Sequence, residues 1–420
     1  MLDTPTVPTE VLAMADRARS ASRALARADT DAKARALRAA AAAVRRHAPR
    51  VLQTNREDLR SGEAAGLSAA MLDRLALDEQ RVEAMARGIE TVAALPDPVG
   101  EIIDHSERPN GLRLQRIRVP IGVIGVIFEA RPNVVTDAAA LCVMAGNAAI
   151  LRASSEALGT ALALQAAFVE GLAAAGLPGD AVQIVNTVDR SAVGAMLAAH
   201  GKIDLIVPRG GKSLVARVQA EARVPVLAHL DGINHSFVHA AADAEKATTI
   251  VVNAKMRRPG ICGATETLLI DRGFPAPGPV VAALLDRGCE VRGDRAVQAL
   301  DPRVLAAGVD DWDTEYLAPV VAAAMVDGLE GALAHIERHG SGHTEAIVTE
   351  DATAAERFLA EVDAAIVMWN ASTQFADGGE FGLGAEIGIA TGRLHARGPV
   401  ALEGLTTYKW QVRGDGQVRP

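Results

Sequence analysis

The sequence predicts an α/β protein with two doubly wound parallel-sheet domains and a small β arm. Apolar runs of strand length alternate with Ala-rich helical segments over most of residues 120–385. The 420 residues, 49% of them hydrophobic, are too many for one simple domain and enough for two cores. A segment that alternates apolar and basic residues at 112–119 has an alternating counterpart near the C-terminus, at 402–415.

The chain begins with a mainly helical region. From Val11 to about Leu95, Ala and Leu recur at spacings of three and four, with charged residues on the opposite face. The segment 112–130 then changes from alternating to continuously β-branched. This change favours an exposed two-stranded ribbon followed by a strand that is buried on both faces.

Strands and helices then alternate up to about residue 255. The expected strands are 147–154, 181–186, 203–210, 224–230 and 236–240. The expected helices are 155–175, 190–200, 212–222 and 243–257. This alternation is typical of a parallel sheet covered on both faces, whose ligands lie at the carboxyl ends of the strands.

The alternation repeats in the second half of the chain, which predicts a second α/β domain. We expect a cofactor-binding domain from 1–111 and 120–255, and a catalytic domain at 256–385. The segments 112–119 and 400–420 would form the β arm, and 386–399 would return the chain to the cofactor domain.

Composition excludes several classes of function. The net charge of −9 provides no basic surplus for nucleic acid or anionic membranes, and only 3% of the residues are aromatic. The longest uncharged apolar stretches are too short to span a bilayer. Three cysteines do not make a disulfide framework, so we expect a reducing cytoplasm.

Several catalytic and metal-binding signatures are missing. The sequence has no G-x-S-x-G, H-E-x-x-H or Walker A motif. His335, His339 and His343 recur at four-residue spacing, but Gly340 and Gly342 interrupt that helix. His229, His235 and His239 have no cysteine or carboxylate at ligand spacing, so we expect no metal.

Two loops that follow strands could contact a nucleotide. Residues 207–214, VPRGGKSL, place two glycines between a strand and a helix, where backbone N–H groups can face a pyrophosphate. An ordinary turn is the alternative interpretation. Residues 151–157, LRASSEA, end another strand with an arginine and two serines, which suits an adenosine ribose and its 2′-phosphate.

The segment 256–267, MRRPGICGATET, contains the one cysteine with unusual surroundings. Cys142 and Cys289 lie in apolar segments and are expected to be buried and inert. Cys262 lies between Ile261 and Gly263 at the expected domain junction, and two arginines precede it. Positive charge lowers a thiol pKa, so Cys262 is a candidate nucleophile, with a buried structural cysteine as the open alternative.

Taken together, these motifs resemble the aldehyde dehydrogenase superfamily. Their order is VPIGVIGVIFEARPN, GNAAILRASSEA, LPGDAVQIVN, a strand ending in VPRGG, and the cysteine loop. FEARPNVVTDAAALC, VNAKMRRPGICGATETLL, STQFADGGEFGLGAEIGIATGRLHARGP and LTTYKW are most similar to the branch that reduces L-glutamyl 5-phosphate in proline biosynthesis. The resemblance covers essentially the whole chain.

The resemblance implies two catalytic residues and a set of substrate-binding arginines. Cys262 would be the thiolate nucleophile, and Asn133, at the end of EARPN, would stabilise the oxyanion. Because the substrate carries a phosphate and a carboxylate, arginines should converge on it. Arg131 and Arg397 are the candidates. Arg257 or Arg258 would lower the thiol pKa.

The resemblance also implies a nicotinamide cofactor, NADPH or NADP. Arg152 and Ser154 would lie near the adenosine ribose and its phosphate. Gly210 and Gly211 would face the cofactor at the helix start, and Glu315 would hold the nicotinamide ribose.

The chain departs from ordinary aldehyde dehydrogenases at one informative place. Those enzymes carry a glutamate that activates water to hydrolyse the thioester. The corresponding stretch here is AHLDGIN, 228–234, with His229 near that place and Asp231 as the remaining candidate base. An enzyme that reduces an acyl phosphate needs no such base, because hydrolysis would waste its substrate.

The implied reaction is the NADPH-dependent reduction of L-glutamyl 5-phosphate to L-glutamate 5-semialdehyde and phosphate, through a cysteine thioester. A general NAD(P)-dependent aldehyde dehydrogenase that oxidises aldehydes is the alternative, and a non-catalytic nucleotide-binding protein is a third class. A separate glutamate 5-kinase would supply the acyl phosphate and is a candidate partner. The arm suggests a homo-oligomer.

Overall fold

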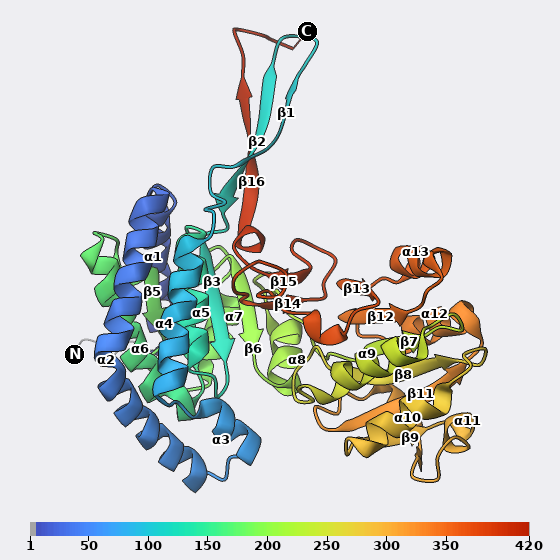
Figure 1. Ribbon diagram of the computed structural model, residues 1–420. Helices are drawn as coiled ribbons and strands as arrows, with labels where there is room; N and C mark the ends of the chain where they lie inside the picture. The colour runs from blue at the N-terminus through green and yellow to red at the C-terminus, as the bar shows by residue number, and fades with distance from the viewer. Residues whose placement is uncertain (1–5, 420) are drawn as a thin grey trace. The chain divides into compact units, whose positions relative to one another are not determined.

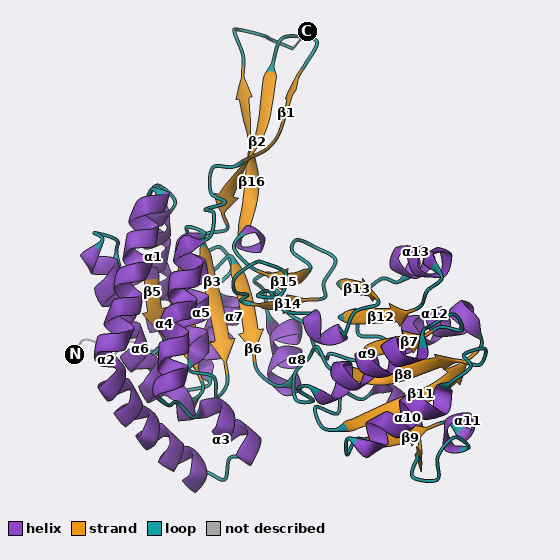
Figure 2. Cartoon of the chain, in the orientation of Figure 1, coloured by secondary structure: helices purple, strands orange, loops and turns teal. Residues whose placement is uncertain are grey.

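The computed structural model describes residues 6–419, which divide into two compact units (Figures 1 and 2). The first unit comprises residues up to Ala228, Gly382–Gly388 and the chain from Val400 onward. The second comprises His229–Phe381 and Ile389–Pro399. The expectation of an α/β protein with parallel sheets is confirmed.

Four helices open the first unit. They are α1 (Val7–Leu25), α2 (Thr30–Ala64), α3 (Ala69–Leu75) and α4 (Glu79–Ala94). Asp29, Ser68 and Asp78 cap three of them, because each side chain accepts a hydrogen bond from a backbone N–H in the first turn. The helical pattern expected between Val11 and Leu95 is therefore observed.

Helix α6 (Leu158–Ala174) packs against α2 at very short range. An added Cβ on Gly171 would lie 2.3 Å from the backbone nitrogen of Ala40, so only glycine permits this approach. Residues 155–174 are long and apolar enough to cross a membrane, but half of that stretch is buried inside the protein. Burial of this kind is what a core helix shows.

The first sheet has four parallel strands in the order β5-β4-β3-β6. The strands are β3 (Val123–Phe128), β4 (Ala148–Ala153), β5 (Val182–Ile184) and β6 (Leu205–Arg209). The other helices of this sheet are α5 (Asn133–Met144), α7 (Ser191–Ala198) and α8 (Lys212–Glu221). The chain reverses its direction across the sheet between β3 and β6, and ligands bind at the carboxyl side of such a switch point.

A three-stranded antiparallel ribbon projects from the first unit (Figure 1). It contains β1 (Ile102–Glu107), β2 (Arg113–Pro120) and β16 (Thr406–Arg413). The expected pairing of 112–119 with the C-terminal strand is present, since Arg113 pairs with Arg413 and Pro120 with Thr406. Strand β1 was not expected.

The second unit is built on a seven-stranded parallel sheet in the order β10-β9-β11-β8-β7-β12-β13. The strands are β7 (Asn234–Val238), β8 (Thr265–Asp271), β9 (Glu290–Gly293), β10 (Leu305–Ala306), β11 (Val320–Val326), β12 (Thr344–Val348) and β13 (Ile366–Trp369). The helices are α9 (Ala244–Met256), α10 (Pro277–Asp286), α11 (Arg295–Gln298), α12 (Gly328–His339) and α13 (Ala352–Glu361). The short strands β14 (Gly388–Ala390) and β15 (Gly398–Val400) form a separate sheet.

The structure differs from the expected domain limits in two places. The boundary lies at 228/229 instead of 255/256, because β7 pairs with β8 and β12 in the second sheet. Residues 382–388 belong to the first unit and 389–399 to the second. The expected catalytic domain 256–385 therefore loses residues 382–385, and only the first part of the expected return segment 386–399 lies in the first unit. An apolar strand pattern predicts a parallel strand but not which sheet receives it.

The strand expected at 224–230 is reduced to a single bridge between Val226 and Ile206. Pro225 lacks the N–H that a continuous ladder requires, although its carbonyl accepts a hydrogen bond from Ile206.

Candidate active site

A thiol and two imidazoles meet at one edge of the second sheet. One ligand atom from each of His229, Cys262 and His343 lies within 4.8 Å of the others. The three residues precede β7, β8 and β12, which are neighbours in the sheet. Because the strands are parallel, their amino ends share one edge. The three side chains therefore lie together at the amino-terminal edge of the second sheet.

Asn234, the first residue of β7, ties the three segments together. Its Nδ2 donates to the carbonyl oxygens of Cys262 at 2.6 Å and Ala264 at 2.8 Å. Its Oδ1 accepts from the backbone N–H of Thr344 at 3.2 Å, next to His343. Asn234 is fully buried, so this one amide fixes the cysteine loop against the start of β12.

Gly232 allows the chain before β7 to approach the cysteine loop closely. A Cβ at this position would lie 2.3 Å from the carbonyl oxygen of Cys262. The N–H of Gly232 donates to Glu315 Oε1 at 3.0 Å. Glu315, expected to hold a cofactor ribose, thus supports the loop that carries His229 in this structure.

Hydrogen bonds orient both imidazoles. Nδ1 of His229 lies 2.8 Å from the carbonyl oxygen of Ile389, which can only accept, so in the neutral ring Nδ1 carries the proton. Nδ1 of His343 lies 2.8 Å from Thr344 Oγ1. His343 is fully buried, and its Nε2 has no hydrogen-bond partner within residues 6–419.

Gln374, which follows β13, holds the segment before Cys262 in place. Nε2 of Gln374 donates to the carbonyl oxygens of Ala254 and Arg258 at 3.0 and 3.2 Å. The guanidinium of Arg257 reaches Gln374 Oε1 at 3.5 Å. Arg257 is one of the two arginines that precede Cys262, and this contact gives it Gln374 as a structural partner.

The other two thiols are chemically inert. Burial raises the pKa of Cys142 and that of Cys289 to about 12, so both remain protonated near neutral pH. All three cysteines are free. Cys262 is partly exposed, unlike the other two.

A buried ion pair joins α9 to β8, the strand that follows Cys262. Lys255 Nζ and Glu266 Oε2 are 2.5 Å apart, and both side chains are fully buried. Burial raises the pKa of Glu266 to about 7, while the charge of Lys255 opposes that shift. Removing either partner would leave an uncompensated buried charge.

In the first unit, a carboxylate occupies the start of α8. Glu129 Oε2 accepts a hydrogen bond from the N–H of Gly211 at 2.9 Å. A Cβ on Gly210 would lie 2.4 Å from the same oxygen. The two glycines therefore lie between β6 and α8, at the switch point between β3 and β6, and Glu129 was not anticipated there.

Arg152 and Ser154 lie at the carboxyl end of β4. Arg152 is only 8% exposed, its Nη2 donates to the carbonyl oxygen of Val188 at 3.4 Å, and its Nε has no hydrogen-bond partner among the described residues. The hydroxyl of Ser154 accepts from the N–H of Ala130 at 3.2 Å. Ala130 has a φ of 44°, so this bond holds a strained turn after β3.

Asn133 is the exposed first residue of α5. Its Nδ2 donates to Asp137 Oδ2 at 2.9 Å, one turn along the helix. Burial raises the pKa of Asp137, and this hydrogen bond opposes the shift. Arg131 lies two residues earlier, in the loop between β3 and α5. Both residues belong to the first unit, whereas Cys262 belongs to the second.

Arg397 is paired with an acidic residue. Its Nη1 donates to Asp363 Oδ1 at 2.6 Å, and Arg393 binds the same carboxylate. Both arginines line a cavity of about 540 Å³ within the second unit, with Ser341 and Gly342 on its wall. Since Gly342 precedes His343, the cavity shares a loop with the thiol and imidazole group.

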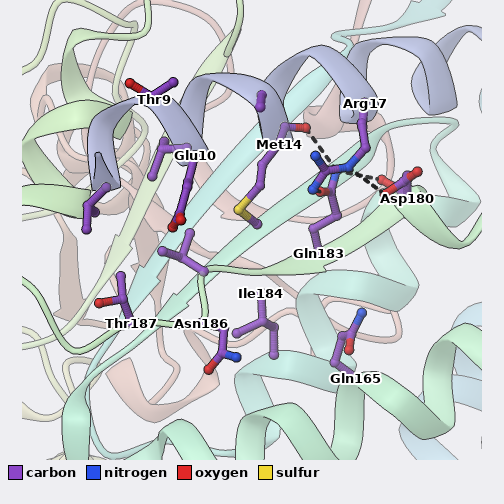
Figure 3. A pocket seen from close by; sticks show the side chains of 14 residues that line it. Thr9, Glu10, Met14, Arg17, Gln165, Asp180, Gln183, Ile184, Asn186 and Thr187 are labelled. Atoms are coloured by element: carbon purple, nitrogen blue, oxygen red, sulfur yellow. Dashed lines mark hydrogen bonds and ion pairs between the residues drawn. The ribbon is translucent and has the colours of Figure 1, made fainter. Parts of the chain in front are cut away.

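A second cavity of about 540 Å³ lies in the first unit between α1 and the chain that follows β5 (Figure 3). Figure 3 shows Arg17 joined to Asp180 across it, and Glu10 on α1 pointing toward the chain near Thr187. Its lining within the described residues contains none of the candidates above, so it is not the proposed site.

Sequence reasoning missed Asn234, His343 and Glu129 as parts of these sites. Spacing along the chain grouped His343 with His335 and His339, but those two lie on α12, where His339 binds Asp313. The signal available for His343 was its position directly before a strand, between Gly342 and Thr344.

Comparisons with known proteins identify the family. The sequence model of the aldehyde dehydrogenase family matches residues 6–288. A gamma-glutamyl phosphate reductase from Sphingopyxis alaskensis is 67% identical over 407 residues, covering 97% of this chain and 95% of the relative. The reductase from Zymomonas mobilis is 62% identical over 416 residues, covering 98% and 97%.

Solved structures agree with these relatives. The crystal structure of gamma-glutamyl phosphate reductase from Thermotoga maritima has a TM-score of 0.95 and 41% identity, covering 98% of this chain and all of that one. An acetylating aldehyde dehydrogenase from Geobacillus thermoglucosidasius has a TM-score of 0.71 with 19% identity, covering 99% and 98%, and shares the fold.

Proposed function

Because this chain belongs to the aldehyde dehydrogenase family, and within it to the gamma-glutamyl phosphate reductases, we propose how its own residues perform that reaction. The enzyme reduces L-glutamyl 5-phosphate to L-glutamate 5-semialdehyde in proline biosynthesis, with a nicotinamide cofactor. The comparisons support this reduction and not the general oxidation of aldehydes to acids. The observation that carries the site assignment is the partly exposed thiol of Cys262 beside two oriented imidazoles.

The first chemical step uses Cys262 and His343. The Cys262 sulfur attacks the carbonyl carbon that carries the phosphate, and the thiol proton passes to His343 Nε2. The bond from that carbon to the phosphate oxygen breaks, and phosphate leaves with the electron pair. A buried imidazole nitrogen without a partner among the described residues is a suitable proton acceptor.

The oxyanion of this step needs hydrogen-bond donors. The backbone N–H of Cys262 is one candidate, and its loop is fixed by Asn234. Asn133 is the second candidate, on the strength of its place at the end of EARPN. Each such donor is worth roughly 10²–10³ in rate.

The first unit suits a nicotinamide dinucleotide. A four-stranded parallel sheet ends at a switch point with Gly210 and Gly211, and the buried guanidinium of Arg152 has an unused N–H within the described chain. When bound, the nicotinamide supplies the hydride that reduces the thioester. Glu315 remains the expected partner of the nicotinamide ribose.

We assign NADPH instead of NADH from charge near Arg152. Burial lowers the pKa of Arg152, and repulsion from Arg190 and Arg217 adds to that effect. Three guanidinium groups are thus close enough to interact, although Glu156 and Glu129 offset part of their charge. A 2′-phosphate would relieve this repulsion, and Ser154 stays a weaker candidate because its hydroxyl already binds Ala130.

The chain has His229 in the segment where oxidising relatives carry the water-activating glutamate. Its Nδ1 is committed to the carbonyl oxygen of Ile389, which fixes the ring. Asp231 follows two residues later and is the other candidate base. We assign no water activation to either, because hydrolysis of the thioester would waste the acyl phosphate.

Arg397 is the preferred arginine for an anionic group of the substrate. It lines the cavity next to Gly342 and shares Asp363 with Arg393, so the pair retains one net positive charge. Arg131 stays the second candidate, from its place in EARPN.

Three further features complete the proposal. We place the enzyme in the cytoplasm. We propose that a glutamate 5-kinase supplies its acyl phosphate, and this kinase is also a candidate partner. The β1-β2-β16 ribbon, with exposed aromatic residues on β16, is the candidate contact for a homo-oligomer.

One assay tests the reaction class. NADP⁺ reduction by the full chain is followed with L-glutamate 5-semialdehyde in the presence and absence of inorganic phosphate, and repeated with NAD⁺. We expect turnover that requires phosphate and is faster with NADP⁺. Equal rates without phosphate would instead indicate an enzyme that oxidises the aldehyde to an acid.

A further inference from the structure

The cysteine and histidine group at the edge of the second sheet has the composition of a metal site. Cys262 offers a soft thiolate, and His229 and His343 offer imidazole nitrogens, all within 4.8 Å of one another. Thiolate and imidazole ligands favour zinc over calcium or magnesium, which prefer oxygen.

The orientation of the two imidazoles supports this interpretation. Metal-binding histidines usually donate the other ring N–H to a backbone carbonyl or hydroxyl group, which fixes the ring. His229 does so through Ile389 at 2.8 Å, and His343 has Thr344 Oγ1 at 2.8 Å from its Nδ1. In His229 this leaves Nε2 with the lone pair that a metal requires.

His343 provides an independent observation. The residue is fully buried, yet its Nε2 makes no hydrogen bond within residues 6–419. An unpartnered buried nitrogen is costly, and it belongs to a side chain whose ligand atom lies within reach of the Cys262 sulfur.

We propose that His229, Cys262 and His343 bind one zinc ion, which occupies the Cys262 sulfur and holds the enzyme in a reversible inactive state. Zinc bonds of about 2.0–2.3 Å place tetrahedral ligand atoms about 3.5 Å apart, so the group closes by about 1 Å on binding. The sulfur loses the proton and binds through the electron pair that would attack the substrate. Three protein ligands leave a fourth position for water.

Metal binding by the chelator-treated full chain tests the proposal. Zn²⁺ is titrated in competition with a chromophoric chelator, and Co²⁺ is used as a spectroscopic probe. We expect one equivalent of metal, a thiolate-to-cobalt charge-transfer band in the near ultraviolet, and inhibition that follows occupancy and is reversed by EDTA. Because the band reports coordination and not turnover, the test is independent of the proposed catalytic roles.

Variants identify the ligands. Cys262→Ser should remove the charge-transfer band, and His343→Gln should weaken zinc binding by at least about tenfold, the loss that even an outer-shell change causes. His239→Gln is the matched control. His239 directly follows β7, the strand that His229 precedes, and its ring also lies within hydrogen-bond distance of a threonine hydroxyl. It should leave the affinity unchanged.

Folding is checked by near-ultraviolet circular dichroism, and wild-type protein alkylated at Cys262 serves as a second sample in which this thiol is blocked. The proposal is overturned if Co²⁺ gives no thiolate band with the wild type. It is also overturned if alkylated protein or His343→Gln binds Zn²⁺ as tightly as the wild type does.

Discussion

At the scale of single residues, Asn234 is the side chain on which the arrangement around Cys262 depends most. It satisfies the carbonyl oxygens of Cys262 and Ala264 and the N–H of Thr344, three backbone groups from two separate segments. A buried amide that bridges two loops fixes both at once.

Asn234→Ala should therefore impair catalysis and stability together. Unsatisfied buried groups cost about 1–3 kcal/mol each, so we expect a loss of roughly 2–5 kcal/mol in the free energy of unfolding. The loosened cysteine loop should lower kcat by tenfold or more with a smaller change in KM, measured by steady-state kinetics and urea denaturation.

The control for Asn234 is Asn253→Ala, an exposed position on α9 whose side chain makes none of the described hydrogen bonds. It should leave both measurements unchanged. If Asn234→Ala behaved like this control, the amide would not be the residue that positions the loop.

His335 should make the stability depend on pH. Burial lowers its pKa to about 3, with repulsion from His235 and His339 adding to the effect. The unfolded value is near 6.5, so below that pH the unfolded chain binds a proton that the folded protein excludes. The free energy of unfolding therefore falls as the pH falls from 6.5 toward 3. Between pH 7.5 and 5.5 we expect a loss of about 1 kcal/mol from this group.

Urea denaturation at those two pH values, on wild type and His335→Gln, measures this contribution. The variant should lose less stability on acidification than the wild type, while His200→Gln, an exposed site, should follow the wild type. Equal pH dependence in wild type and His335→Gln would contradict the assignment.

At the scale of helices and strands, the local sequence pattern is sufficient to predict an element when its buried residues recur at one regular spacing. The helices expected at 212–222 and 243–257 are observed as α8 and α9, with limits that differ by at most one residue at each end, because each covers its sheet with one apolar face. The failures have local causes. Pro225 interrupts the ladder expected at 224–230, and β1 has no apolar alternation because both of its faces are exposed.

The packing of α6 on α2 gives a matched pair of glycine substitutions. Gly171→Ala places a methyl group 2.3 Å from the Ala40 backbone nitrogen, so the helices must separate, at a cost of about 1–3 kcal/mol. Gly194→Ala on α7 meets no atom of the described chain within 4 Å and should stabilise by about 0.5–1 kcal/mol.

Thermal denaturation of the two variants measures this difference in sign. A Gly171→Ala protein as stable as the wild type would show that the close approach of α2 and α6 does not constrain this position.

At the scale of the whole molecule, the order of the strands brings together side chains that lie far apart in the sequence. The cysteine motif and the parallel sheets could be predicted, because each has a local pattern. The meeting of His229 and His343 with Cys262 could not, since it depends on the order β8-β7-β12. The same limit applies to Glu129, which meets Gly211 only because β3 and β6 are neighbours.

The ribbon leads to a prediction about assembly. Trp410 and Val412 are 53% and 56% exposed on one face of β16, with Arg116 stacked over Trp410. A second copy of the chain would cover such a face. Trp410→Asp with Val412→Asp should therefore lower the mass measured by size-exclusion chromatography with light scattering.

Lys409→Asp is the control for the ribbon, because adjacent residues of a strand point to opposite faces. It should leave the mass at the wild-type value. An unchanged mass for the double variant would exclude this face of β16 as the contact between copies.

The role of Cys262 is the central claim, and one comparison tests it most directly. The rate of phosphate-dependent NADP⁺ reduction with L-glutamate 5-semialdehyde is measured for the wild type, Cys262→Ser and Cys289→Ser. Cys289 is buried and its thiol stays protonated, so its variant should retain turnover. Cys262→Ser should lose turnover while still binding NADP⁺. Turnover retained by Cys262→Ser would contradict the mechanism.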